Sequence, residues 1–317
     1  MTDLIITVGE NEFKGLLDRE RVLSDVKEHL TPWLRLVEDL VNYGTNLVPR
    51  CMPSSDRKLK DMVLLPILLR QTVAMLDGIQ VLLSNGAVQT ANLQLRALLE
   101  AAIYVKWILA GDSERKANYY YVHNLRRRQK WALRTEAGPS GTSDFERTMA
   151  NFGIHITDEM KAKAKKENQE IDRALGSKYA AINKDFRDLR KKRHGEPPWY
   201  SPLGPKNLAE MARDVGWEPL YILVYSIASG LMRSSSYEEH VRIEPETVML
   251  QPIRYLENFG SVFLFSVSIA LDLYRRVLEE YRPGELTTFS RKYVEKWQKQ
   301  YLNFVKIKYE NFEHITI

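Results

Sequence analysis

The sequence contains almost no cysteine, because Cys51 is the single one in 317 residues. An intrachain disulfide therefore cannot form, and a zinc site built on several cysteines is excluded. We expect a protein of a reducing compartment and place it in the cytoplasm. The six histidines are scattered. None lies at metal-ligand spacing from another, so we expect no metal and no other cofactor.

Several common catalytic motifs are also missing. The chain has no Walker A loop, no G-x-G-x-x-G, no H-E-x-x-H and no G-x-S-x-G. A basic, apolar leader is absent from the first residues, MTDLIITVGENEF. The two most apolar windows, Val63–Leu83 and Ser261–Leu273, do not predict membrane spans, because the first contains Arg70 and Asp77 and the second is too short. We therefore expect no membrane partner.

The overall composition is that of an ordinary folded protein. Hydrophobic residues make up 44% of the chain and charged residues 27%. The formal net charge is +5 and the pI is near 9.0. Such a balance permits an acidic partner such as RNA without requiring one.

The most informative stretch is 88–110, VQTANLQLRALLEAAIYVKWILA, which is apolar nearly all round. On a soluble chain this pattern predicts a helix that is buried against several neighbours. One narrow polar stripe interrupts it, because Gln89, Asn92, Arg96 and Glu100 recur at helical spacing. Buried charges must be paired, so the stripe is either a structural ion pair or the wall of a functional polar pocket.

A second charged stripe precedes it. Arg70 and Asp77 share one face of the helical stretch 57–83, and we expect them to meet Arg96 and Glu100. Pro66 predicts a kink or a second helix start within this stretch. The Ser84-Asn85-Gly86 turn then predicts an antiparallel hairpin with the central helix.

The remaining pattern predicts an all-α fold, a multi-helix bundle around this central hairpin. No run shows convincing strand alternation. We expect N-terminal helices in 1–56, including one from Trp33 to Tyr43 that stops at Gly44. A core helical domain should occupy 57–282 and a C-terminal amphipathic helix 283–317, all in one compact unit. That last helix packs on the body or binds a protein partner.

A third polar feature lies at 119–131, YYYVHNLRRRQKW. Its basic run, Arg126, Arg127 and Arg128, is interleaved with tyrosines and His123. Aromatic and basic side chains in alternation can bind single-stranded nucleic acid. The alternative is a solvated basic face above tyrosines that pack in the core.

An arginine followed by a histidine after six intervening residues occurs twice, as Arg187…His194 and Arg233…His240. Chance alone gives about one or two such spacings. The pattern is similar to the R-x4–6-H motif of HEPN ribonucleases, which are small helical domains that often act as toxins or antiviral effectors. In the second pair, Tyr237 and three serines add hydroxyl groups. A histidine can move the proton of a ribose 2′-OH, and an arginine can stabilise phosphate charge.

Residues 76–109, with RALLEAAIYVKWIL as the second arm of the hairpin, resemble a bacterial family of helical proteins of unknown function. The matching positions are Asp77, Arg96, Glu100, Tyr225 and Ser229. Members carry a later Tyr-x-x-x-Ser-x-x-x-His segment. This chain has Arg233 at the histidine position, so the role has either moved to His240 or been lost.

The leading hypothesis is a HEPN-like, metal-independent endoribonuclease of bacterial defence. In it, His240 is the general acid or base and Arg233 stabilises the phosphate. Arg96, Glu100, Asp77, Arg70 and Tyr237 would support them, and the resemblance implies a homodimer. The alternative is a non-catalytic helical module that binds a protein partner or a small ligand in the polar pocket.

Overall fold

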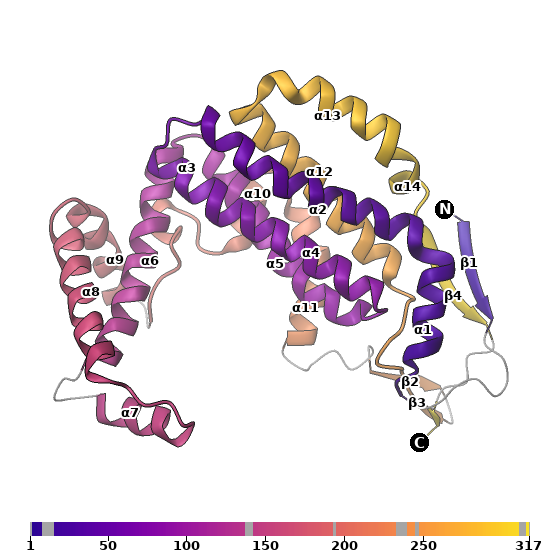
Figure 1. Cartoon of the computed structure of the whole chain (residues 1–317), viewed down its shortest axis with the longest axis horizontal. Coiled ribbons are helices and arrows are strands. Elements are labelled where there is room, and N and C mark those ends of the chain that lie inside the picture. Colours follow the sequence, from indigo (N-terminus) through magenta and orange to yellow (C-terminus); the bar gives the residue numbers. More distant parts are fainter. Residues whose placement is uncertain are drawn as a thin grey trace. The chain divides into compact units, whose positions relative to one another are not determined.

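The computed structural model describes residues 2–7, 16–136, 142–192, 195–232, 240–244, 247–310 and 315–316. The fold is all-α, as predicted, with a few short strands at its margins (Figure 1). The chain divides into two compact units. The first comprises Met1–Gly111 and Leu208–Ile317, and the second comprises Asp112–Asn207. The boundaries predicted at 57 and 283 do not coincide with these units, because the second unit is one contiguous segment inserted between two helices of the first.

The first unit is built around α5, Val88–Leu109. Among the described elements it packs against α4 (Arg70–Ser84), α10 (Leu208–Asp214), α11 (Glu218–Met232) and α12 (Phe259–Tyr281). Most of its apolar side chains are buried, and they lie all around the helix. The predicted central helix is therefore confirmed, and its apolar circumference follows from having neighbours all round.

The helical hairpin is also confirmed. Its first arm consists of α3 (Leu59–Val63), a π-helical turn over Leu64–Leu69 that contains Pro66, and α4. The π turn accommodates a proline that would otherwise break an α-helix. Between α4 and α5, Gly86 has φ +68, and a Cβ there would lie 2.2 Å from Cγ1 of Val22. Glycine is thus required both for the turn and for the close approach of α1 (Arg19–Asp25).

The helix predicted to stop at Gly44 does not stop there. Instead α2 runs from Thr31 to Cys51, with Pro32 in its first turn as expected. A Cβ at Gly44 would lie 2.2 Å from Oη of Tyr274 in α12. That hydroxyl donates to the carbonyl oxygen of Leu40 at 3.1 Å. Gly44 therefore marks a close helix contact and not a helix end.

The structure also contains short strands, which we did not predict because no run showed convincing strand alternation. β1 (Thr2–Thr7) pairs in parallel with β4 (Val305–Glu310). A second small sheet joins β2 (Val241–Glu244), β3 (Thr247–Leu250) and β5 (Ile315–Thr316). The predicted C-terminal helix consequently ends early. α13 (Leu286–Lys292), a π turn and α14 (Gln298–Leu302) are helical, and the alternating sequence VKIKYE then forms β4.

The helical part of this C-terminal segment packs on the body of the first unit. Trp297 is fully buried. Its ring lies edge-on to that of Tyr43 in α2, with centroids 5.7 Å apart, and Phe289 contacts the same tyrosine ring. Core packing is thus observed for this face, while Val294 and Leu302 remain exposed.

One helical stretch, Leu59–Ser84, is long and apolar enough to cross a membrane by length and composition alone. Half of its most apolar window is buried inside the protein. Buried core helices of water-soluble proteins have the same composition.

The second unit is a small helical layer. α6 (Ser113–Thr135) packs against α7 (Thr142–Asn151), α8 (Asp158–Gly176) and α9 (Ala180–Lys192). Phe186 of α9 is fully buried in it. The loop after α9 adds Trp199, whose ring contacts Tyr120 with centroids 5.4 Å apart. The tyrosines of α6 thus pack in this unit, which was one of the two alternatives for that stretch.

Candidate functional site

The polar stripe on α5 has a C-terminal half, formed by Arg96 and Glu100, which α11 covers. Arg96 forms an ion pair with Glu100, with Nε 3.3 Å from Oε1. Its Nη2 donates to Oη of Tyr225 at 2.6 Å, and its guanidinium carbon lies 3.9 Å from the centroid of the Tyr225 ring. The Arg96 side chain is 17% exposed. The predicted pair is therefore real, and Tyr225 completes it as a three-residue cluster.

Tyr221 extends this cluster by one helical turn. Its ring stacks on that of Tyr225, with centroids 4.6 Å apart. Burial, together with the neighbouring Tyr225 hydroxyl, raises the pKa of Tyr221 to about 12. Arg96 is thus held by a carboxylate, a hydroxyl and an aromatic face, which is the arrangement of a structural ion pair.

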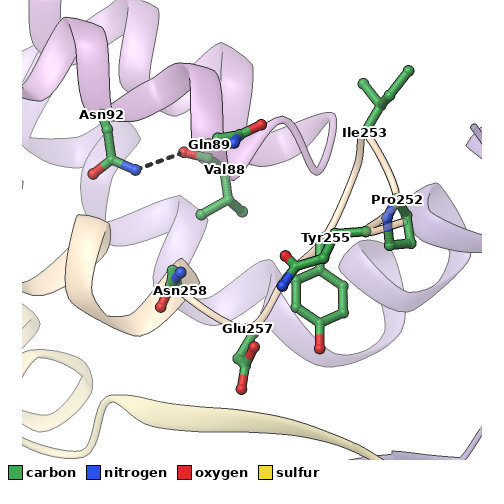
Figure 2. Close-up of a pocket in the computed structure, with 9 residues that line it drawn as sticks. Val88, Gln89, Asn92, Pro252, Ile253, Tyr255, Glu257 and Asn258 are labelled. Atoms are coloured by element: carbon green, nitrogen blue, oxygen red, sulfur yellow. Dashed lines mark hydrogen bonds between the residues drawn. The ribbon is translucent and has the colours of Figure 1, made fainter. Parts of the chain in front are cut away.

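The N-terminal half of the same stripe, formed by Gln89 and Asn92, lines an open pocket of about 240 Å³. Gln89 and Asn92 form one wall, and the segment 251–258 that leads into α12 forms the other (Figure 2). Asn92 is 8% exposed. The stripe therefore divides into a closed ionic part and an open carboxamide-lined part.

Two residues expected to support Arg96 lie elsewhere. Arg70 and Asp77 are both exposed on α4. No described hydrogen bond or ion pair joins either of them to Arg96 or Glu100. The expectation of an embedded second stripe was thus wrong, because α4 directs this face to solvent and buries Thr72, Val73 and Leu76 instead.

The predicted catalytic pair is only partly described. His240 is exposed in the turn before β2, where its carbonyl oxygen accepts from the amide of Gln251. Arg233 and Tyr237 lie outside the described residues, as does His194. Within the described part of the chain, no hydrogen bond or ion pair joins His240 to the Arg96 cluster.

The three predicted nucleic-acid-binding arginines of α6 differ in environment. Arg126 is buried, and it donates to Glu196 at 2.5 Å and to Oδ1 of Asn183 at 2.6 Å. Arg128 is exposed and forms an ion pair with Glu167 at 2.7 Å. Arg127 is exposed and lines a pocket. Only Arg127 is therefore placed to meet a ligand there.

This pocket, the α6 basic pocket, has a volume of about 280 Å³. Its lining consists of His123, Arg127, Lys130, Trp131, Arg134 and Glu196. Trp131 is exposed at 55%, with the Arg134 guanidinium 4.8 Å from the centroid of its ring and the Phe145 ring edge-on to it. Glu196 contacts Lys130 at 3.1 Å as well as Arg126. Three basic side chains and an exposed indole thus surround one acidic group.

Electrostatics in this pocket favour an anion. Burial and the nearby Arg127, Arg126 and Lys130 lower the pKa of His123 to about 4, although Glu196 acts in the opposite sense. The imidazole is therefore neutral at pH 7. Burial alone would raise the pKa of Glu196, but its contacts with Arg126 and Lys130 outweigh burial and leave that pKa lowered.

Sequence reasoning missed Lys130, Trp131, Arg134 and Glu196. The helical spacing i, i+4, i+7, i+8, i+11 places His123, Arg127, Lys130, Trp131 and Arg134 on one face of α6, and this pattern was available in the sequence. Glu196 comes from the loop after α9. It accepts a hydrogen bond from Arg126, which lies 70 positions earlier in the chain. No local pattern predicts such a contact.

The fold and its central hairpin define an all-helical protein, and a family model matches most of this helical part. Residues 61–232 match the model of a family described as a family of unknown function (DUF5677). The match covers more than half of the chain, so the protein belongs to this family. It includes α5, α11 and the whole second unit. No curated protein and no solved structure matches the chain.

Proposed function

We propose that the protein binds single-stranded RNA through the α6 basic pocket. The observation that carries this proposal is the exposed Trp131 ring beside Arg127, Lys130 and Arg134 in one concave surface. Bases of any sequence stack on exposed aromatic rings, and phosphates bind guanidinium and ammonium groups. The net charge of +5 adds long-range attraction to a polyanion.

The pocket suits single strands better than duplexes. Stacking on Trp131 needs an unpaired base, and a base within a duplex offers no free face. Arg127 has no described hydrogen bond or ion pair, so its charge is available for a phosphate. Lys130 and Arg134 already contact Glu196 and Trp131, and they would hold a phosphate while keeping those positions.

Titration of a fluorescently labelled, U-rich single-stranded RNA tests the proposal by anisotropy. Wild type should bind it more tightly than the same sequence in a duplex. Trp131→Ala should weaken single-strand binding about tenfold, because stacking contributes about 1–3 kcal/mol per base. Circular dichroism checks that the variant is folded, which we expect because the side chain is exposed. Equal affinity of wild type and Trp131→Ala would overturn the proposal.

We extend this proposal to metal-independent cleavage of the bound RNA, the activity that the HEPN resemblance implies. The 2′-oxygen attacks the adjacent phosphorus, forming a 2′,3′-cyclic phosphate and releasing the 5′-oxygen. A neutral imidazole takes the 2′-OH proton, and a proton is returned to the leaving oxygen. The sequence offers His240 with Arg233 for this role. The pocket offers His123, which is neutral at pH 7 and lies among cationic groups.

Incubation of purified protein with total bacterial RNA and EDTA distinguishes these candidates. Loss of cleavage in His240→Ala supports the sequence hypothesis, and loss in His123→Ala supports the α6 basic pocket. Intact RNA with the wild-type protein contradicts cleavage and leaves RNA binding alone. A role in bacterial defence and the implied homodimer belong to the same proposal. They are tested by growth arrest on induced expression and by light scattering of the purified protein.

A further inference from the structure

The pocket at the N-terminal end of the α5 polar stripe is rich in carboxamide side chains. Carboxamides dominate it, from Gln89 and Asn92 on α5 and from Gln251 and Asn258 on the segment before α12. Val88, Pro252 and Ile253 add apolar surface, and Tyr255 adds an aromatic ring. Among the described residues, no lysine or arginine lines this pocket, and the lining residue Glu257 adds negative charge. Such a lining, with a carboxylate and no described cation, disfavours an anionic ligand.

Asn92 is the buried anchor of this pocket. Only 8% of the residue is exposed. Its Nδ2 donates to the carbonyl oxygen of Val88 at 3.4 Å, the long end of the hydrogen-bonding range. Its Oδ1 accepts no hydrogen bond from any described residue. A buried carboxamide has two donors and two acceptor sites, so most of its capacity is open to a ligand.

Asn258 is the second free carboxamide. It occupies the N-cap position of α12, where asparagine commonly accepts from the helix backbone, yet its side chain makes no capping hydrogen bond. Figure 2 shows the Asn92 and Asn258 side chains on either side of the space beneath Val88, with Glu257 pointing away from it. Two carboxamides thus border one gap with an apolar roof.

The aromatic wall is fixed in position. The Tyr255 ring stacks on that of Tyr309 from β4, with centroids 4.8 Å apart and 19° between the planes. Tyr309 in turn accepts at Oη from the amide of Leu256 at 3.2 Å. Burial, the main influence there, raises the pKa of Tyr309, so its hydroxyl stays protonated. The wall is therefore organised before a ligand arrives.

We propose that this pocket binds an uncharged nucleobase, presented as a free nucleoside. Paired donor and acceptor groups of Asn and Gln match the hydrogen-bonding edge of a base. The apolar and aromatic walls suit its flat faces. The described lining residues include a carboxylate, Glu257, and no cation, which selects against the phosphate of a nucleotide. The inference does not depend on RNA binding by the second unit.

Isothermal titration of the full-length protein with adenosine, guanosine, cytidine and uridine tests this inference. At least one nucleoside should bind, and its 5′-triphosphate should bind more weakly. Asn258→Ala and the similarly sized Asn92→Leu should each reduce the affinity about tenfold or more, because each removes hydrogen bonds to the base. Thr90→Ala is the matched control, since Thr90 is exposed on the same turn of α5 and does not line the pocket.

Two further results bear on the inference. Trp131→Ala should bind the nucleoside as wild type does, which separates this pocket from the α6 basic pocket. Absence of binding by all four nucleosides would overturn the inference. So would unchanged affinity in Asn258→Ala, a variant on an exposed position that does not depend on folding of the core. Equal binding of inorganic phosphate would overturn it in favour of an anion site.

Discussion

The guanidinium of Arg96 lies over the ring of Tyr225, 3.9 Å from its centroid, and also donates to the hydroxyl of that ring at 2.6 Å. The two residues are 129 positions apart. They join the central helix to α11, and in the sequence the second unit is inserted between these two helices. We infer that this contact stabilises the first unit.

Substitution of this pair should lower stability in graded steps. Tyr225→Phe keeps the ring and loses one hydrogen bond, so the free energy of unfolding should fall by about 1 kcal/mol. Arg96→Ala also loses the stacking and the ion pair with Glu100, and the fall should be about 2–3 kcal/mol. Urea denaturation measures both. A loss for Arg96→Ala no larger than for Arg70→Ala, an exposed arginine of α4, would contradict this role.

Gly44→Ala should destabilise the protein, although alanine normally favours a helix. The added Cβ would lie 2.2 Å from Oη of Tyr274 and 2.6 Å from Cγ2 of Val73. Such overpacking costs about 1–3 kcal/mol. Tyr274→Phe in the Gly44→Ala background removes the nearest atom, so the double variant should lose less than the sum of the two single losses. Strict additivity in urea denaturation would show that Gly44 and Tyr274 do not clash.

Asp61→Ala should be among the more damaging single changes. This fully buried carboxylate accepts from the hydroxyl of Tyr281 at 2.9 Å and from the amide of Lys58 at 3.0 Å, the latter within a capping box at the start of α3. Its loss leaves both donors without an acceptor, at a cost of about 2–4 kcal/mol. Asp61→Asn keeps an acceptor and should lose less. A midpoint in urea equal to that of wild type would refute the assignment.

His123 should make stability depend on pH. Its pKa is lowered from 6.5 to about 4 in the folded protein, so the unfolded chain binds the proton more tightly between these values. Stability is therefore complete above pH 6.5 and falls as the pH drops toward 4. The loss should be on the order of 1 kcal/mol after solvent screening. His123→Gln should reduce this dependence, and a pH profile of urea stability equal to that of wild type would contradict the assignment.

Much of the first unit was predictable from local patterns. The apolar circumference of α5, its polar stripe and the Asn85-Gly86 turn depend on residues near one another in sequence. The pairing of β1 with β4 was not predictable in this way, because Thr2 pairs with Val305 at the other end of the chain. The alternation within VKIKYE of β4 was local, and we missed it. Gly44 was misinterpreted because a glycine required by close packing has the same sequence appearance as one that ends a helix.

The candidate sites show the same division. The stripe predicted Arg96 with Glu100 and also the lining residues Gln89 and Asn92. It did not predict that Tyr225 closes one half while the other stays open, because that depends on where α11 and α12 pack. In the second unit, the arginine run was recognised as one feature. In the folded protein, Arg126 forms an ion pair with Glu196 and Arg128 forms one with Glu167, whereas Arg127 lines the pocket.

The most direct test of RNA binding compares Arg127→Ala with Arg128→Ala. Each variant removes one exposed positive charge from neighbouring positions on α6, but only Arg127 lines the basic pocket. Affinity for a labelled single-stranded RNA is measured at several salt concentrations. Arg127→Ala should bind about fivefold to tenfold more weakly with a shallower salt dependence, and Arg128→Ala should differ little from wild type. Equal losses in the two variants would show that the pocket is not the RNA site.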